Sequence, residues 1–252
     1  MENTADIIWL DVAESSNDEA RKAIDSLDNL SVVAVRCQTA GRGQGENTWL
    51  TAPGENMTFS IVLKDFDILP NQQIAISQIT ALAVVEFLEH HGIDAKIKLP
   101  NDIYVGERKI CGILIENSLC AGKIKWSIVG IGINVNQTTF PSSLPHPTSI
   151  LLEKSYSSPT PDKNPEAPLD LKLLLQQFHE IYSEYYYDYI SDKSNFPGTH
   201  ENSRIPSDNS SKTKLEVLDQ HFRSKLLNLD QAQKYVSSRV IMLQGILSHS
   251  VN

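Results

Sequence analysis

Apolar residues in the first half of this chain occur in short runs that are separated by turn-forming residues. Runs of about four to eight residues that are rich in Val and Ile and bounded by Gly, Pro, Asn or Asp are typical of β-strands. The pattern predicts strands over residues 7–12, 31–36, 57–63, 95–99, 103–105, 109–116 and 125–134. A further strand is predicted at residues 239–243.

Longer segments repeat their apolar residues at the spacing of an amphipathic helix. These segments predict helices over residues 17–27, 72–91, 169–189 and 215–227. Gly92 directly follows the second of them, where a glycine suits the left-handed conformation that ends many helices. Because hairpins alternate with single long helices, the pattern indicates an α/β fold of the α+β type, with helices packed on a mixed β-sheet.

Composition separates a large domain from polar segments within it. With 252 residues, of which 40% are hydrophobic, the chain can form one sizeable domain, which we expect to span residues 1–230. Two stretches near 151–168 and 191–213 are poor in apolar residues and are expected to be polar insertions.

Charge and cysteine content argue against several classes of protein. The net charge of −9 disfavours broad nucleic-acid binding, which needs a basic surface. No run approaches the roughly 20 apolar residues of a membrane helix, and the first residues lack the pattern of a secretory signal. The three cysteines form no CxxC pair, so a reduced, cytoplasmic setting is expected.

One segment is locally basic within this acidic chain. Residues 96–109 carry four lysines or arginines and two acidic residues, which gives a local net charge of +2. A site of this kind attracts an anionic small molecule.

A glycine-rich loop is predicted at residues 38–47, with glycines at alternate positions around Arg42. Such glycines let backbone N–H groups approach an anion, and the forked guanidinium of arginine suits phosphate or carboxylate. The spacing matches neither a P-loop nor a dinucleotide-binding fingerprint. Taken alone, the segment is equally consistent with a flexible surface loop.

Polar residues gather at a predicted bend between two strands. Pro100 favours an extended Leu99, so Asn101 and Asp102 come at a bend where their side chains can point into a cleft. Asp102 could hold Mg²⁺ or a substrate N–H, and Lys109 opens the next strand. The alternatives for this stretch are an ordinary turn and a solvated lysine at a strand edge.

Glycines remove side chains from one face of two predicted strands. Gly130 and Gly132 alternate before Asn134, and Gly112 lies in the preceding strand. A face without side chains can receive a flat ligand or a closely packed neighbour. Asn134 would add amide hydrogen bonds, while close packing in a core strand remains the alternative.

Together and in this order, the motifs resemble those of the biotin–protein ligases (biotin–[acetyl-CoA-carboxylase] ligases), of the single-function type without a DNA-binding domain. The resemblance covers about residues 7–136 and rests on ESSN at 14–17, QTAGRGQ at 38–44, KLPND at 98–102, KICGILIE at 109–116 and GIGIN at 130–134. It implies a catalytic domain related to the class II aminoacyl-tRNA synthetases.

The family's reaction has two steps. Biotin and MgATP first give biotinyl-5′-AMP and pyrophosphate, and a lysine of a biotin carboxyl carrier domain then attacks the mixed anhydride and releases AMP. The resemblance therefore implies ATP and Mg²⁺ as cofactors, with biotin and the carrier domain of a carboxylase as partners. It also implies a cytoplasmic enzyme that binds neither DNA nor membranes, and relatives often form homodimers.

The resemblance also assigns roles to residues. Those implied in catalysis are Lys109, Arg42 and Asp102. Those implied in biotin binding are Ser15, Ser16, Asn17, Gln38, Gly41, Arg42, Lys109 and Gly112. Those implied in ATP binding are Arg42, Trp49, Lys98, Asn101 and Asn134, with Asp102 as the metal ligand.

Several positions depart from the family pattern. Leu99 replaces a tryptophan, Gln44 replaces a second arginine and Glu46 adds a negative charge to the loop. Loss of a cation at Gln44 is expected to weaken retention of the adenylate. The loop at 41–47 is expected to be mobile without ligand and to order over the biotinyl-adenylate.

The ends also depart from the family. The first motif begins too early for the winged-helix domain of some relatives. The C-terminal SH3-like barrel is expected to be truncated or absent, with residues 231–252 as its remnant.

Two other functions remain open on the sequence. A lipoate or octanoate ligase or transferase shares the fold, although the segments at 38–43 and 98–102 favour biotin. A biotin-binding protein with an impaired second step would bind biotin without labelling an acceptor.

Overall fold

The computed structural model describes residues 6–64, 66–157, 167–191 and 213–227. The strand predicted at 239–243 and the expected domain remnant at 231–252 lie outside the described residues. Most of the predicted insertion at 191–213 also lies outside them.

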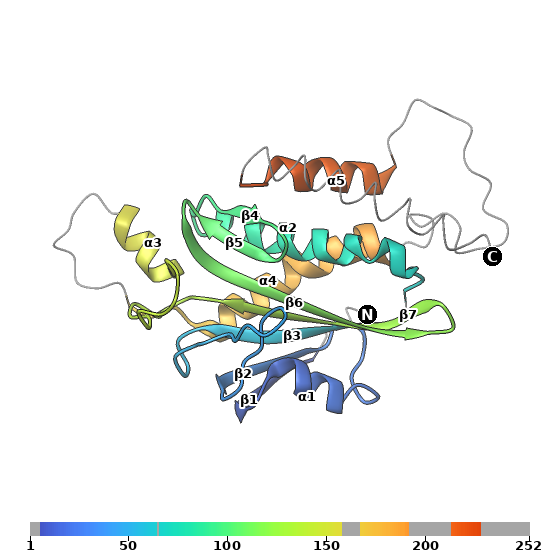
Figure 1. The fold of residues 1–252 in the computed structure, drawn as a ribbon, viewed down its shortest axis with the longest axis horizontal. Coiled ribbons are helices and arrows are strands. Elements are labelled where there is room, and N and C mark those ends of the chain that lie inside the picture. The colour runs from blue at the N-terminus through green and yellow to red at the C-terminus, as the bar shows by residue number, and fades with distance from the viewer. Residues whose placement is uncertain (1–5, 65, 158–166, 192–212, 228–252) are drawn as a thin grey trace.

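Seven strands form one mixed sheet in the order β1-β2-β3-β7-β6-β5-β4 (Figure 1). The strands are β1 (Ile7–Ala13), β2 (Val32–Gln38), β3 (Met57–Leu63), β4 (Lys96–Lys98), β5 (Asp102–Val105), β6 (Arg108–Cys120) and β7 (Lys123–Ile133). β1 runs parallel to β2, and the other neighbouring pairs are antiparallel. The predicted mixed sheet is confirmed, and the β6–β7 hairpin extends further than its apolar residues indicated.

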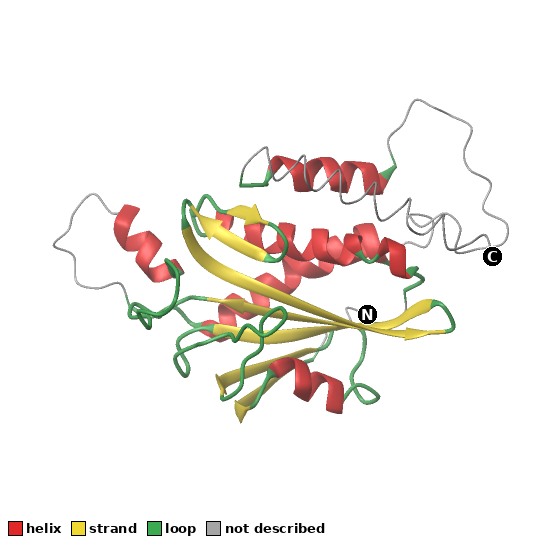
Figure 2. Cartoon of the chain, viewed as in Figure 1, coloured by secondary structure: helices red, strands yellow, loops and turns green. Residues whose placement is uncertain are grey.

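Helices cover both faces of this sheet, as Figure 2 shows. They are α1 (Ser16–Lys22), α2 (Ile74–His90), α3 (Ile150–Ser157), α4 (Leu171–Tyr185) and α5 (Lys214–Ser224), with short helical turns η1 (Pro70–Gln72) and η2 (Tyr186–Ile190). α1 lies on one face, α2 and α4 lie on the other, and α5 lies outside α2 (Figure 1). No helix in the described part of the chain is long and apolar enough to cross a membrane.

The structure contains one helix that the sequence pattern did not predict. α3 begins where the chain turns polar, in the stretch expected to be an insertion from residue 151 onward. Its Ile150 and Leu151 side chains are buried, and this short apolar run was obscured by the Pro, Ser and Thr around it. Another difference concerns α1, which ends at Lys22 although a helix was predicted as far as residue 27.

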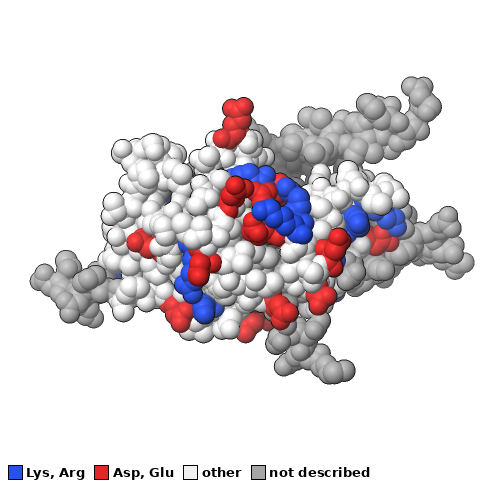
Figure 3. Space-filling view, turned by 90° about the horizontal axis from the view of Figure 1, so that it is seen from below, with Lys and Arg blue, Asp and Glu red and all other residues white. Residues whose placement is uncertain are grey.

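Acidic and basic side chains lie next to one another on the face shown in Figure 3. α1 carries two such pairs, in which Arg21 Nη1 lies 3.3 Å from Asp18 and Lys22 Nζ lies 2.7 Å from Glu19. Each pair joins residues three apart on a helix, where exposed ion pairs contribute little to stability.

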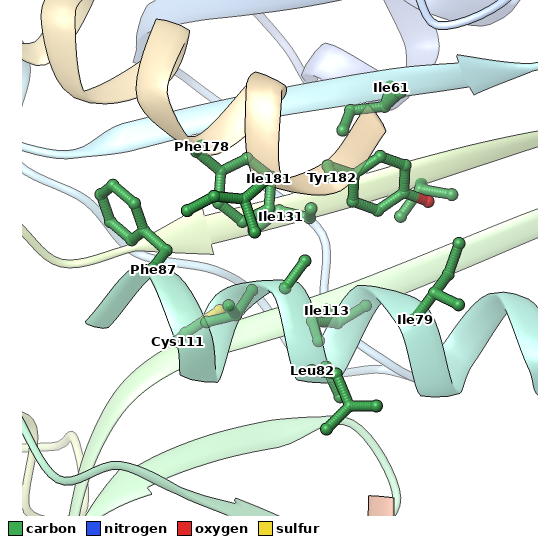
Figure 4. Packing of buried hydrophobic residues seen from close by; sticks show 14 of the residues in the cluster. Ile61, Ile79, Leu82, Phe87, Cys111, Ile113, Ile131, Phe178, Ile181 and Tyr182 are labelled. Atoms are coloured by element: carbon green, nitrogen blue, oxygen red, sulfur yellow. The ribbon is translucent and has the colours of Figure 1, made fainter. Parts of the chain in front are cut away.

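The main core lies between the sheet and the α2–α4 layer. Phe178 of α4 packs edge-on against Phe59 of β3 and Phe87 of α2, with ring centroids 5.3 and 5.7 Å apart. All three side chains are fully buried. Figure 4 shows Phe87 and Phe178 among the side chains of this core. α2 is apolar on nearly all sides, as expected for a helix that is enclosed by the sheet, α4 and α5.

The end of the described chain extends the sheet beyond β4. The Ile97 N–H donates to the Lys225 carbonyl, and the Leu227 N–H donates to the Ile97 carbonyl, both at 2.8 Å. This parallel bridge covers the outer edge of β4 with residues from beyond α5.

Replacement of the central aromatic ring tests the core. We expect Phe178→Ala to lower the free energy of unfolding by about 3–5 kcal/mol, because it leaves a cavity between three elements. Urea denaturation followed by circular dichroism measures the loss. Leu173→Ala, on the same helix at a side chain that is 53% exposed, should change stability by about 0.5 kcal/mol or less. Equal losses in the two variants would contradict this assignment of the core.

Candidate active site

The floor of the candidate site is a part of the sheet that lacks side chains. Gly112 of β6 lies opposite Gly132 of β7, and the indole of Trp49 covers both. A Cβ at Gly112 would lie 3.0 Å from Trp49 Cζ3, and one at Gly132 would overlap the indole. The predicted bare face therefore exists, and a closely packed neighbour from the same chain occupies it.

The glycine-rich loop folds back on itself and positions this indole. The Trp49 N–H donates to the Gly41 carbonyl at 2.9 Å, and Arg42 pairs with Thr48 in a single antiparallel bridge. A Cβ at Gly41 would overlap the Trp49 carbonyl, so the close approach requires glycine there. Apart from this bridge, the segment is the irregular loop that was predicted.

A small cavity with both polar and apolar walls borders Trp49. Its walls include Ser15, Ser16, Asn17, Gln38, Arg42 and Gly112, so the structure brings most of the residues expected to bind biotin together. The Ser16 N–H donates to Gln38 Oε1 at 2.7 Å. The cavity measures only about 40 Å³.

Ser60 supports this cavity from below and was not found by the sequence analysis. Its hydroxyl donates to Asn17 Oδ1 at 2.6 Å and lies 2.8 Å from Ser16 Oγ. Gly130 makes room for Asn17, because a Cβ there would overlap Asn17 Oδ1. The signal in the sequence was that Ser60 is the only residue with a hydroxyl among the apolar residues that follow Thr58 in β3.

Arg42 is held by carboxylates and does not point freely into the cavity. Its guanidinium donates to Glu116 at 3.0 and 3.1 Å and lies 2.8 Å from Asp18. Arg21 Nη2 also lies 2.7 Å from Glu116. Glu116 meets Arg42 because residues 112, 114 and 116 of β6 project from the same face of the sheet.

Glu116 remains ionised although it is half-buried. Burial raises the pKa of its carboxyl, but hydrogen bonds from Asn17 and Arg42 and the charges of Arg42 and Arg21 outweigh burial and leave the pKa below its usual value. Asn17 Nδ2 contributes a donor at 2.7 Å. Glu116 is the last residue of the motif at 109–116, but the sequence alone assigned it no role.

A larger cavity of about 290 Å³ also borders Trp49. Lys109 Nζ and Asp102 Oδ1 form an ion pair of 2.7 Å there, and Lys109 Nζ lies 5.8 Å from the centre of the Trp49 ring. Asn101 also lines this cavity, and its Nδ2 donates to the Ile113 carbonyl at 2.9 Å. These side chains come from the predicted bend and the strand that follows it.

Asn134 lines the larger cavity and has a buried acceptor that is not used. Its Nδ2 donates to the Thr148 carbonyl at 2.9 Å, whereas its buried Oδ1 has no hydrogen-bond partner among the described residues. Trp49 Nε1 is also buried and has no hydrogen-bond partner among the described residues. An unsatisfied buried polar atom is costly, so each is available for a ligand.

Lys98 lies beside the larger cavity without lining it, because it pairs with Asp102 in the β4–β5 ladder and contacts Tyr104, which lines that cavity. Its ammonium donates to the Tyr104 hydroxyl at 3.1 Å and lies 4.2 Å from the centre of that ring. It lines neither of the two cavities beside Trp49.

Asp102 is the one expected metal ligand. No group of three or more His, Cys, Asp or Glu side chains among the described residues is placed to hold a metal ion. Mg²⁺ that arrives with nucleotide phosphates needs only one or two protein carboxylates. The single carboxylate of Asp102, whose side chain is partly exposed to the larger cavity, fits that limited role.

The contact between Arg42 and Glu116 can be tested through the loop. We expect Glu116→Gln to accelerate tryptic cleavage after Arg42 roughly two- to fivefold, because an exposed ion pair contributes about 0.2–1 kcal/mol. Mass spectrometry of the first fragments measures the rate. The control is Glu19→Gln, whose carboxylate pairs with Lys22 instead. Unchanged cleavage in Glu116→Gln would show that the pair does not hold the loop.

Curated relatives resemble this chain over its first half. The bifunctional ligase/repressor BirA of Bacillus subtilis is 34% identical over 142 residues, which are 55% of this chain and 43% of that protein. The biotin–[acetyl-CoA-carboxylase] ligase of Paracoccus denitrificans is 30% identical over 128 residues, 48% of this chain and 51% of that protein. The matched segments thus span about half the length of these relatives.

A solved structure resembles the chain over a longer stretch. The biotin protein ligase of Aquifex aeolicus, in complex with biotin and ATP, superimposes with a TM-score of 0.64 and 26% identity, and the match covers 88% of this chain and 78% of that one. The profile of the biotin/lipoate A/B protein ligase family matches residues 9–134, which is half of the chain and includes Trp49, Asp102, Lys109 and Asn134. The chain therefore belongs to the biotin/lipoate A/B protein ligase family.

Proposed function

We propose that this chain is a biotin–protein ligase, which joins biotin to AMP and then transfers biotin to a lysine of a biotin carboxyl carrier domain. One observation carries the proposal. Two half-sites of different chemistry meet at Trp49, one with amide and hydroxyl groups and one with a lysine–carboxylate pair and a free amide acceptor. An enzyme that joins a neutral ring system to a nucleotide needs such a pair of adjoining sites.

The small cavity is the proposed biotin site. Ser16, Asn17 and Gln38 supply hydroxyl and amide groups that can match the ureido ring. A volume of about 40 Å³ admits only a few water molecules, so biotin enters only when Arg42 and Trp49 move. This requirement agrees with the expectation that the loop orders over the bound adenylate.

The larger cavity is the proposed nucleotide site. Trp49 offers an aromatic face for the base, and Asn134 Oδ1 can accept a hydrogen bond from its amino group. Lys109 would lie near the phosphates, and Asp102 would hold a Mg²⁺ that arrives with them. Bound Mg²⁺ would neutralise phosphate charge.

The first step brings two anions together. A carboxylate oxygen of biotin forms a bond to the α-phosphorus, while the bond from that phosphorus to the bridging oxygen breaks and pyrophosphate leaves. Lys109 and Arg42 are the cations proposed to offset the charge of the reacting groups. Arg42 can do so only after it leaves Glu116, so loop movement and charge compensation are coupled.

The second step transfers biotin to the acceptor. The neutral amine of a carrier lysine attacks the carbonyl carbon of the anhydride, the carbon–oxygen bond to AMP breaks, and the nitrogen loses a proton. Asp102 is the carboxylate proposed to receive that proton.

The three cysteines are free thiols, which supports the proposal of a reduced, cytoplasmic setting.

One assay separates this proposal from its alternatives. The chain is incubated with biotin, MgATP and a biotin carrier domain, and pyrophosphate release and acceptor mass are followed. We expect pyrophosphate and one added biotin per acceptor. Turnover with lipoate or octanoate but not biotin would overturn the proposal, and pyrophosphate without labelling would indicate an impaired second step.

Lys109 tests the chemistry directly. We expect Lys109→Ala to slow adenylation by about 100-fold or more, because it removes a cation that faces the developing charge. Lys125→Ala, at an exposed position on β7, is the matched control and should keep full activity. Thermal unfolding of both variants should stay close to that of the unmodified chain, since changes at partly exposed side chains are small. Full adenylation by Lys109→Ala would refute its role.

A further inference from the structure

The unpredicted helix α3 is tied to the first residue of β6 by a buried carboxylate. Arg108 donates through Nε and Nη2 to the two oxygens of Glu153, both at 2.8 Å. Glu153 is only 6% exposed, whereas the Arg108 side chain is 42% exposed. A buried carboxylate held in this way has a fixed position, because two parallel hydrogen bonds define its plane.

Glu153 also fixes the segment before α3, through a hydrogen bond with Thr148. The hydroxyl of Thr148, which is fully buried, donates to Glu153 Oε1. The Thr148 N–H donates to the Lys109 carbonyl at 2.9 Å, and the Lys109 N–H donates to the His146 carbonyl at 2.8 Å. The N–H and the carbonyl of Lys109 are therefore both bonded to this segment along one edge of β6.

Thr148 also sets the orientation of Asn134. Its carbonyl accepts a hydrogen bond from Asn134 Nδ2, so the buried Oδ1 is the amide atom left without a partner, in a residue that lines the larger cavity. Without a fixed Thr148 carbonyl, the amide would have no reason to prefer this orientation over the reversed one. One short network thus bonds to two of the polar residues that line the nucleotide site, Lys109 through its backbone and Asn134 through its side chain.

We propose that the Arg108–Glu153–Thr148 network, here called the α3 bridge, positions Asn134 and Lys109 for nucleotide binding. The proposal rests on the proposed function in that it takes ATP as the ligand of the larger cavity. None of the three bridge residues lines either cavity beside Trp49, so they act through Asn134 and Lys109 and not by contact with the ligand.

The position of the bridge makes its effect selective. It reaches the nucleotide half of the site through residues 134 and 109, whereas the small cavity depends on α1, Gln38 and the glycine-rich loop. Loss of the bridge therefore weakens ATP binding and leaves biotin binding intact. A role confined to anchoring α3 would lower stability without such a split.

Variants of Thr148 and Arg108 test the bridge in the full chain. Thr148→Val removes the hydroxyl at nearly constant shape, Thr148→Ser retains it, and Arg108→Gln removes the bidentate donor at an exposed position. Titration calorimetry measures the affinities for ATP, GTP and biotin separately. The control is Asp67→Asn, which breaks a comparable ion pair with Lys123 on the far end of β7.

We expect the affinity for ATP to fall by roughly tenfold in Thr148→Val and Arg108→Gln, the size of effect typical of one lost hydrogen bond at a buried site. Affinity for biotin should stay within about twofold, and Thr148→Ser should restore ATP binding. Preference for ATP over GTP should also fall, since a reversed Asn134 amide would present a donor to the carbonyl of guanine. The KM for ATP in the ligase reaction should rise with little change in kcat.

The outcomes separate the two proposals. An unmodified chain that binds biotin but not ATP would overturn the proposed ligase function and the bridge with it. Normal ATP binding in the unmodified chain together with unchanged affinity in both variants would overturn the bridge alone. Equal losses for ATP and biotin, or a similar loss in Asp67→Asn, would show a general structural effect and would also overturn it.

Discussion

The contact of the Trp49 indole with the glycine floor is the constraint on which the rest of the site depends. Because Gly112 and Gly132 have no side chains, one flat ring can lie directly on the backbone of two neighbouring strands. That ring forms a wall of both cavities. The glycine-rich loop is bonded to Trp49 through Gly41, and the ammonium of Lys109 lies 5.8 Å from the centre of its ring.

Most of the fold could be predicted from the sequence because its elements are regular and strongly patterned. The β3 strand was predicted with its observed bounds, and α2 differs from its prediction by one or two residues at each end. α3 could not be predicted, since eight residues with three apolar ones carry too weak a periodic signal within a polar stretch. The β6–β7 hairpin was underestimated because its far end is polar and partly exposed.

The residues of the candidate site also differ in whether the sequence predicts them. Motifs of local sequence identified Lys109, Asp102, Asn134, Trp49 and the polar start of α1, and the structure brings these together. Interactions between distant residues could not be predicted in this way. Neither the pairing of Arg42 with Glu116 nor the link from Arg108 to Glu153 leaves a mark at short range in the sequence. Lys98 is an intermediate case, since it does not line the larger cavity but contacts Tyr104, which does.

The bridge between Ile97 and Leu226 has a consequence for how the molecule assembles. β5 follows β4 directly in the sequence and can pair with one edge of it soon after both are synthesised. The residues that cover the other edge of β4 come more than half the chain length later in the sequence. Contacts of such long sequence separation close large loops and form slowly. During synthesis, the outer edge of β4 therefore stays open until the segment after α5 has emerged, and an open strand edge is a template for pairing with other chains.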